Sequence, residues 1–223
     1  VLNGDKITGV TVQQMDSGID TGDILGVAGA RGEKTANRIQ NFATLTKRPP
    51  GSAIKPLAVY SPALEKGLLT WATVLDDTPH SYVEENGKLV AWPRNSTKTY
   101  RGLINIAYAL KVSTNTVAIK VLEQVGLKTA FDFCYDTLEM KSMIEYGEFS
   151  DGTGYSDVGL ASLGLGQLNY GVTVREITAA YSMFVNSGIY SEPNSYLRVT
   201  DASGNVLLEN GYNGTVAISE ETA

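Results

Sequence analysis

The sequence has 223 residues, of which 43% are hydrophobic and 19% charged, and its formal net charge is −6. A chain of this length and apolar content can bury a substantial core, which excludes a disordered segment and favours one domain or most of one. The acidic balance excludes the basic surface that phosphate binding requires, so we expect no nucleic-acid partner.

Two segments near the start of the chain predict an antiparallel hairpin. Residues 10–15 and 23–28 each read as a strand, rich in residues that favour extended structure. The polar turn between them passes through Asp16, Gly18, Asp20 and Gly22.

The middle of the chain predicts helices. Residues 105–110 and 115–125 have helical character, with apolar side chains recurring at helical spacing in the second, and Gly126 provides a stop for that helix. The best-marked helix begins at Thr173, because Thr173 and Glu176 fit a capping box. We expect it to end at Gly188 and to carry an apolar stripe formed by Ile177, Tyr181 and Phe184.

A second hairpin is predicted near the C-terminal end. Residues 196–200 and 206–209 read as strands on either side of a polar turn at 201–205. Strands at both ends of the chain with helices between them predict an α+β fold with mixed α/β layers.

Ser52 and Lys55 form the first candidate for chemistry. On a helix, residues three apart share a face with Cβ atoms roughly 5–6 Å apart, so the amine can reach the hydroxyl. The motif alone is weak, since serine-rich chains carry it by chance, but Ser52 is the only serine with lysine at i+3 and it follows Pro49-Pro50-Gly51. That context suits a helix start, where N–H groups favour negative charge on the attacking oxygen. Lys55 is a base only when neutral, which requires a lowered pKa.

The pattern Ser-x-Asn occurs twice, at residues 113–115 and 203–205. The second lies in a predicted hairpin turn, where Ser, Gly and Asn are favoured for backbone reasons. In the first, Ser113 can shuttle a proton and the Asn115 amide can hold a substrate carbonyl, although a simple helix cap at Ser113 is the alternative. Acyl-serine enzymes combine both motifs with Lys-Thr-Gly, and no Lys-Thr-Gly or Lys-Ser-Gly follows Asn115.

Other chemistries find little support in the sequence. His80 is the only histidine and Cys134 the only cysteine, so we expect no metal site, no cofactor and no disulfide; we place His80 in a surface loop and Cys134 in the interior. Residues 163–167 contain Gly164 and Gly166 but lack the other features of a phosphate loop, so a structural loop is expected. No apolar run approaches the roughly 18–20 residues of a membrane helix, and we expect any anchor to lie outside these residues.

An ordered match over nearly the whole chain resembles the transpeptidase domain of class A, bifunctional penicillin-binding proteins. The matching segments are residues 21–25, 48–57, 63–67, 74–79, 92–95, 100–102, 109–110, 113–115, 161–166 and 171–176. The resemblance implies a penicillin-binding protein and serine β-lactamase-like fold, incomplete at its C-terminus. Residues 1–223 are then the N-terminal portion of that domain, with the glycosyltransferase domain, its membrane helix and the C-terminal strands outside them.

The resemblance also implies a function, a D,D-transpeptidase that cross-links peptidoglycan stem peptides through an acyl-serine. Ser52 is the expected nucleophile, Lys55 its base, Ser113 a proton relay to the leaving D-alanine, and Asn115 a substrate-binding residue. The implied partners are stem peptides, β-lactam antibiotics and the missing C-terminal part of the domain, in the same or a separate chain. The implied location is the extracytoplasmic face of the bacterial membrane.

Two alternatives stay open. One is a β-lactamase or D,D-carboxypeptidase of the same fold, which sends water to the acyl-enzyme; Glu148 lies in a polar, flexible-looking stretch that does not establish a deacylating role. The other is a non-catalytic module that binds penicillin or cell-wall peptide.

Because the family draws one oxyanion donor from the Lys-Thr-Gly strand, we expect these residues alone to acylate at least about a hundredfold more slowly than the complete domain.

Overall fold

The computed structural model describes residues 10–13, 24–29, 40–211 and 213–223. Helices and strands are mixed along the chain, which confirms the predicted α+β class. The chain divides into two compact units, of which unit 1 comprises residues 1–48, 135–142 and 172–223 and unit 2 comprises residues 49–134 and 143–171. That residues 1–223 form a portion of one domain stays a prediction.

Unit 2 contains a continuous helical segment from residue 51 to residue 65. It begins as a 3₁₀ turn, η1 (Gly51–Ile54), continues as a π-helix, η2 (Lys55–Tyr60), and ends as α1 (Ser61–Glu65). Pro56 explains the tight start, because proline has no N–H to donate to the carbonyl four residues back, and the Lys55 N–H bonds to Ser52 O instead.

The centre of unit 2 is α3 (Asn115–Val125), which packs against η2 and α5 (Leu160–Leu165). The close approach to α5 depends on Gly164, where an added Cβ would lie 2.6 Å from Ile119 Cδ1. The other helices of this region are α2 (Ile106–Lys111) and α4 (Leu127–Asp132); η3 (Phe133–Thr137) follows α4 and includes residues of both units. The two predicted helices and the end at Gly126, the C-cap of α3, are confirmed.

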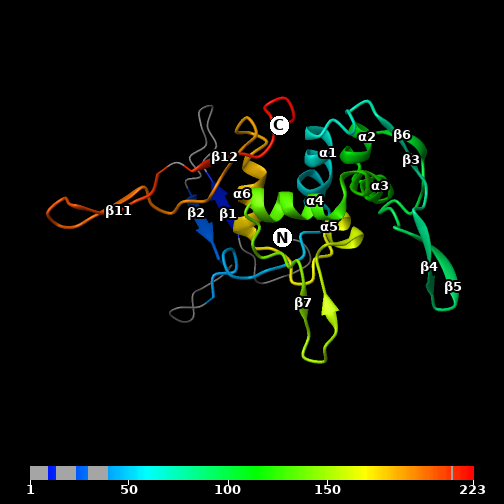
Figure 1. Cartoon of the computed structure of the whole chain (residues 1–223), viewed down its shortest axis with the longest axis horizontal. Coiled ribbons are helices and arrows are strands. Elements are labelled where there is room, and N and C mark those ends of the chain that lie inside the picture. Colours follow the sequence, from blue (N-terminus) through cyan, green and yellow to red (C-terminus); the bar gives the residue numbers. More distant parts are fainter. Residues whose placement is uncertain (1–9, 14–23, 30–39, 212) are drawn as a thin grey trace. The chain divides into compact units, whose positions relative to one another are not determined.

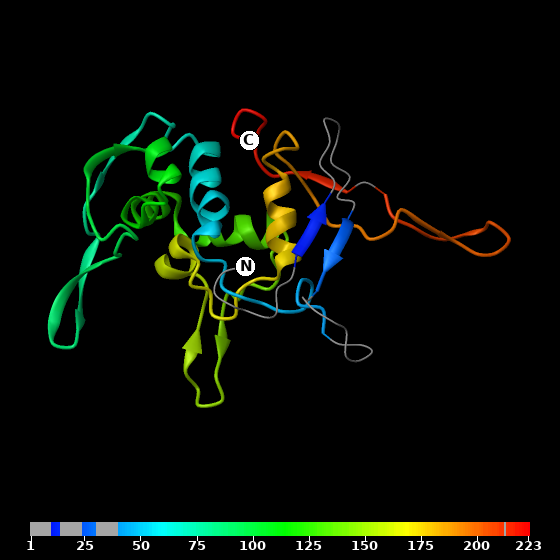
Figure 2. The same cartoon turned by 180° about the vertical axis from the view of Figure 1, so that it is seen from behind.

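Unit 2 contains three antiparallel pairs of strands: β3 (Val74–Asp77) with β6 (Gly102–Asn105), β4 (Ser81–Glu85) with β5 (Lys88–Trp92), and β7 (Gly147–Glu148) with β8 (Gly154–Tyr155). Figures 1 and 2 show the β4–β5 and β7–β8 pairs projecting from the helices of this unit as hairpins. The polar stretch at Glu148 thus includes a short strand. The Tyr155 ring covers Gly147, where a Cβ would lie 2.5 Å from it, and such aromatic cover stabilises a glycine in a strand.

Unit 1 contains both predicted hairpins. β1 (Val10–Gln13) pairs with β2 (Ile24–Ala28), and β10 (Arg198–Thr200) pairs with β11 (Val206–Glu209), both antiparallel. The pairing is confirmed in each case, while the polar turn predicted between the first two strands lies outside the described residues. A further antiparallel pair joins β9 (Ile189–Ser191) to β12 (Gly214–Val216).

The capping box of α6 (Val174–Ser182) is confirmed: Thr173 Oγ1 accepts from the Glu176 N–H at 3.1 Å, and Glu176 Oε2 accepts from the Thr173 N–H at 2.7 Å. The predicted stripe and end are wrong. The helix ends at Ser182, followed by turns up to Gly188, and its buried positions are Ala179, Ala180 and Ser182, with Met183 just beyond. Small side chains are covered completely where a helix packs closely, whereas the larger Ile177, Tyr181 and Phe184 are only partly buried.

Candidate active site

Ser52 and Lys55 lie on the same helical segment but in different environments. Ser52 is exposed in η1, while Lys55, the first residue of η2, is only 1% exposed. The π-helical turn that begins at Lys55 belongs to a class of helix distortion found frequently at functional sites. The nucleophile candidate is therefore open to a ligand, and the base candidate is enclosed by protein.

The buried Lys55 amine contacts both polar residues of the first Ser-x-Asn segment. Lys55 Nζ donates to Ser113 O at 2.8 Å, to Ser113 Oγ at 3.0 Å and to Asn115 Oδ1 at 2.6 Å. An ammonium group has three N–H donors, so these acceptors satisfy all of them. The structure thus brings together residues 58 and 60 positions apart in the sequence, and the Ser52 hydroxyl is not among the three acceptors.

Burial lowers the pKa of the Lys55 ammonium from 10.5 to about 8, because removal from water disfavours the charged form. This is the direction that a general base requires, since half of the amine is neutral at a pH equal to its pKa. The hydrogen-bond acceptors around the amine hold it in place in its charged form.

Ser113 has a left-handed backbone, with a φ of 57°. It follows α2 in a Schellman motif, in which the Ser113 N–H bonds to Leu110 O at 3.0 Å and the Thr114 N–H bonds to Ala109 O at 2.9 Å. Glycine is usual at this position, and a serine there carries strain of about 1–2 kcal/mol. The N-cap of α3 is Thr114, so the alternative reading of Ser113 as that helix cap is wrong.

The orientation of the Asn115 amide is set from a different segment. Asn115 Nδ2 donates to the Arg94 carbonyl at 2.7 Å, which leaves Oδ1 facing Lys55. No motif in the sequence assigns a role to Arg94. The available signal was the match to the family over residues 92–95, which carried no chemistry of its own.

The segment before Ser52 is held by the end of α5. The Gly51 N–H donates to Gly166 O at 3.3 Å, and a Cβ added at Gly166 would lie 2.0 Å from Gly51 O. Gly166 also has a left-handed φ of 73°, so two constraints demand glycine there. Residues 163–165 form the last turn of α5, so the expectation of a loop is wrong for them. It is confirmed only for Gly166 and Gln167, which follow the helix.

The second Ser-x-Asn segment forms the exposed turn between β10 and β11. The N–H groups of Ser203 and Asn205 donate to Asp201 Oδ1 at 2.8 and 2.9 Å, and Asn205 Nδ2 donates to Asp201 Oδ2 at 2.8 Å. The polar groups of this segment therefore bond within their own turn, as expected for residues chosen for backbone reasons.

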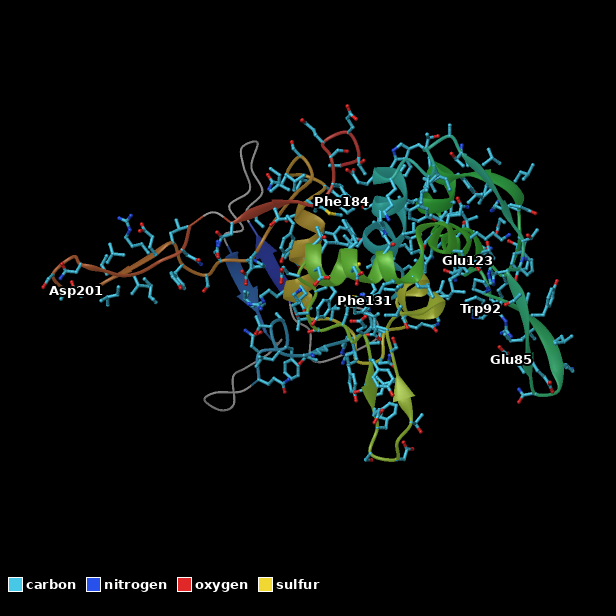
Figure 3. The ribbon with its side chains drawn as sticks, in the orientation of Figure 1. Glu85, Trp92, Glu123, Phe131, Phe184 and Asp201 are labelled. Carbon is cyan, nitrogen blue, oxygen red and sulfur yellow. The ribbon has the colours of Figure 1, made fainter. Side chains whose placement is uncertain are left out.

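His80 and Cys134 contribute no chemistry that the geometry reveals. His80 lies in the loop between β3 and β4, as predicted, and is partly exposed; its Nε2 is 2.9 Å from Glu123 Oε1 and its ring forms a T-shaped contact with Trp92. Figure 3 shows Trp92 and Glu123 close together at the base of the β4–β5 hairpin. Cys134 is buried, which raises its thiol pKa to about 12. Within the described ranges, no group of three His, Cys, Asp or Glu side chains could hold a metal ion, and no helix is long and apolar enough to cross a membrane.

Comparison with known families and proteins gives a consistent result. The family model described as "Penicillin binding protein transpeptidase domain" matches residues 18–223. The chain is 35% identical over 210 residues to penicillin-binding protein 1A of Clostridium acetobutylicum and 37% identical over 215 residues to that of Clostridium novyi. Each alignment covers 91% of this chain but 24% and 23% of the relative, so the chain spans about a quarter of their length.

Solved structures of other bacterial proteins have a fold similar to that of this chain. The Mycobacterium tuberculosis protein PonA1 in complex with penicillin V aligns with a TM-score of 0.72 at 23% identity, over 99% of this chain and 55% of that one. Penicillin-binding protein 1A from Haemophilus influenzae aligns with a TM-score of 0.66 at 27% identity, over 96% of this chain and 28% of that one.

Proposed function

Because the chain belongs to the family of penicillin-binding protein transpeptidase domains, we propose that it contributes the acyl-serine centre of a D,D-transpeptidase. The substrates are the D-Ala-D-Ala ends of peptidoglycan stem peptides, and β-lactams acylate the same serine. The resemblance to class A penicillin-binding proteins is confirmed by these relatives. An extracytoplasmic place of action and a membrane anchor in the parent protein belong to the proposal.

Acylation begins at Ser52. Its Oγ attacks the carbonyl carbon of the D-Ala-D-Ala bond while the hydroxyl proton passes to the neutral Lys55 amine. The exposed position of Ser52 at the start of η1 leaves its backbone N–H available to the oxyanion that forms. When the C–N bond breaks, the leaving D-alanine takes a proton from Lys55 through Ser113 Oγ, which lies 3.0 Å from Lys55 Nζ.

Cross-linking completes the cycle. An amine of a second stem peptide attacks the ester carbon, loses a proton to the base and displaces Ser52 Oγ, which is reprotonated. Asn115 aligns the donor peptide through the second N–H of its amide, since its other N–H is bonded to Arg94 O. A β-lactam follows only the first half of this path, because its opened ring stays attached and excludes the amine.

One observation supports the proposal most directly. A lysine 1% exposed, with its pKa lowered to about 8, shares a helical segment with an exposed serine and bonds to Ser113 and Asn115. A buried lysine used only for structure would need these acceptors too, but it would not need the serine one turn earlier at the protein surface. The activity of residues 1–223 alone stays a prediction.

The test uses fluorescent penicillin and intact-mass measurement on the full-length protein. A stable adduct on the wild type that is absent from Ser52→Ala supports the transpeptidase. Loss of the adduct over time, with release of hydrolysed antibiotic, indicates the lactamase or carboxypeptidase instead. An unlabelled wild type indicates a binding module, and an adduct that persists in Ser52→Ala contradicts the assignment of the nucleophile.

A further inference from the structure

A second polar cluster lies at the start of α3, on elements of unit 2 that come from three parts of the sequence. Asp77 ends β3, Asn95 follows β5, and Thr116 is the second residue of α3. Their exposed fractions are 2%, 7% and 0%. Burying a polar side chain without its hydrogen bonds costs free energy, so each contact in the cluster has a consequence.

The Asp77 carboxylate accepts three hydrogen bonds. Oδ1 accepts from Asn95 Nδ2 at 2.7 Å and from Thr116 Oγ1, and Oδ2 accepts from the Arg101 N–H at 2.9 Å. Asn95 Nδ2 also donates to Thr99 O at 3.0 Å, which uses both hydrogens of that amide group. The orientation of the Asn95 side chain is therefore determined, with its oxygen directed away from Asp77.

The Asn95 oxygen binds the first turn of α3. Oδ1 accepts from the Asn115 N–H at 2.9 Å and from the Thr116 N–H at 3.4 Å. The first N–H groups of a helix have no partner inside it, and the N-cap Thr114 makes no side-chain capping bond. Asn95 thus caps α3 from a separate segment.

The same segment also fixes the Asn115 side chain, since Arg94 O accepts from Asn115 Nδ2 at 2.7 Å. We propose that Asp77 and Asn95 are positioning residues, which hold Asn115 so that its Oδ1 rather than its amino group faces Lys55. This role rests on the proposed function, because it acts through Lys55. Each hydrogen bond adds little net stability, whereas a displacement of about 1 Å near reacting atoms can lower a rate by roughly 10²-fold.

A matched pair of variants separates positioning from stability. Asp157, also in unit 2, is 0% exposed and likewise accepts three hydrogen bonds, from the Ile144 N–H and from the N–H and Nδ2 of Asn169. Asp77→Asn and Asp157→Asn each replace a buried acceptor by a donor and should lower Tm by similar amounts. Positioning predicts that only Asp77→Asn slows acylation, by roughly 10²-fold at saturating penicillin, with the dissociation constant of the initial complex unchanged.

Two variants of Thr116 provide a second test in case the Asp77→Asn protein does not fold. Thr116→Val keeps the shape and removes the hydroxyl that donates to Asp77, while Thr116→Ser keeps the hydroxyl. We expect roughly a tenfold slower acylation in the valine variant and near wild-type rates in the serine variant, well below each Tm.

All variants are measured in the full-length protein by stopped-flow acylation. Wild-type acylation rates in both Asp77→Asn and Thr116→Val would overturn the positioning role, and so would an equal loss of rate in Asp157→Asn. Those results leave the Ser52 chemistry untouched. An unacylated wild type contradicts the proposed function itself, and the positioning role with it.

Discussion

The two Ser-x-Asn segments share a sequence pattern but differ in their hydrogen-bond partners, which are local for residues 203–205 and distant for residues 113–115. Asn205 bonds to Asp201 within its own exposed turn, whereas Asn115 bonds to Arg94 on one side and to Lys55 on the other. Ser203 is the third residue of a local hairpin connection, whereas Ser113 accepts a hydrogen bond from a lysine 58 positions earlier in the sequence. The surroundings of a short polar motif therefore depend on which distant elements pack around it, since the segment at residues 203–205 bonds to Asp201 within its own turn.

The electrostatic environments differ in the same way. Local hydrogen bonds from Asn205 and Ser203 lower the pKa of the exposed Asp201 carboxyl, which stays charged in water. Burial lowers the pKa of Lys55 from 10.5 to about 8, which increases the fraction of the amine that is neutral near pH 7. Only the second shift has the direction that a general base requires.

Removing Lys55 should produce the largest effect. Lys55→Ala deletes the base, and general-base catalysis contributes roughly 10²- to 10⁴-fold, so we expect acylation by penicillin to slow by about 10³-fold. Tm monitors the fold, because Ser113 and Asn115 lose a donor at the same time. Wild-type acylation in a folded Lys55→Ala protein would rule out this base.

Replacing each of the two asparagines by alanine tests the comparison between the two Ser-x-Asn segments. Asn115→Ala removes an acceptor of Lys55 and leaves Arg94 O without its donor, so acylation should slow by roughly 10- to 100-fold. Asn205→Ala removes one exposed hydrogen bond and should leave the acylation rate within about twofold of wild type. The comparison fails if both variants slow acylation equally.

The pH dependence of acylation should reveal the lowered pKa of the buried Lys55. Lys55 acts as a base only when neutral, so below its pKa of about 8 the acylation rate should rise about tenfold per pH unit and then level off. Rates measured between pH 6 and pH 10 give the midpoint. A rate still rising at pH 10 would mean that burial does not lower this pKa.

The smallest effect is one of stability, with opposite signs at the two serines. Ser113→Gly and Ser113→Ala both remove the hydroxyl that accepts from Lys55, which slows acylation, but only glycine relieves the left-handed backbone, so the free energy of unfolding should be about 1 kcal/mol higher in the glycine variant than in the alanine variant. At Ser203, where the backbone is not left-handed, the glycine variant should instead have a free energy of unfolding about 0.5 kcal/mol lower than the alanine variant, because glycine makes the unfolded chain more flexible. Denaturant titration checks both differences, and a Ser113→Gly protein less stable than Ser113→Ala would contradict the strain argument.

Some of these features were predictable because their causes lie close together in the chain. The capping box at Thr173 and Glu176, the helix end at Gly126 and the hairpin around residues 201–205 each depend on residues within a few positions. The motif at Ser52 and Lys55 was readable for the same reason. Their shared helical segment needs only the i, i+3 spacing and a helix start.

Other features depend on packing that local preference does not determine. The stripe expected at Ile177, Tyr181 and Phe184 is only partly buried, because the apolar pattern does not say which side of a helix meets its neighbour. The polar stretch around Glu148 forms strands in which the rings of Tyr146 and Tyr155 cover the glycines opposite. Both features rest on contacts that a pattern of residue types does not contain.

The sequence by itself determined the α+β class and the family, and it indicated the residues of the candidate site. Only the tertiary structure decided that Lys55 is buried, that Ser113 has a left-handed backbone, and that Asn115 is held by Arg94 and Asn95. The physical reason is the range of the interactions: local hydrogen bonds and periodicity act over a few residues, whereas desolvation and amide orientation depend on whichever distant segments the folded core brings together.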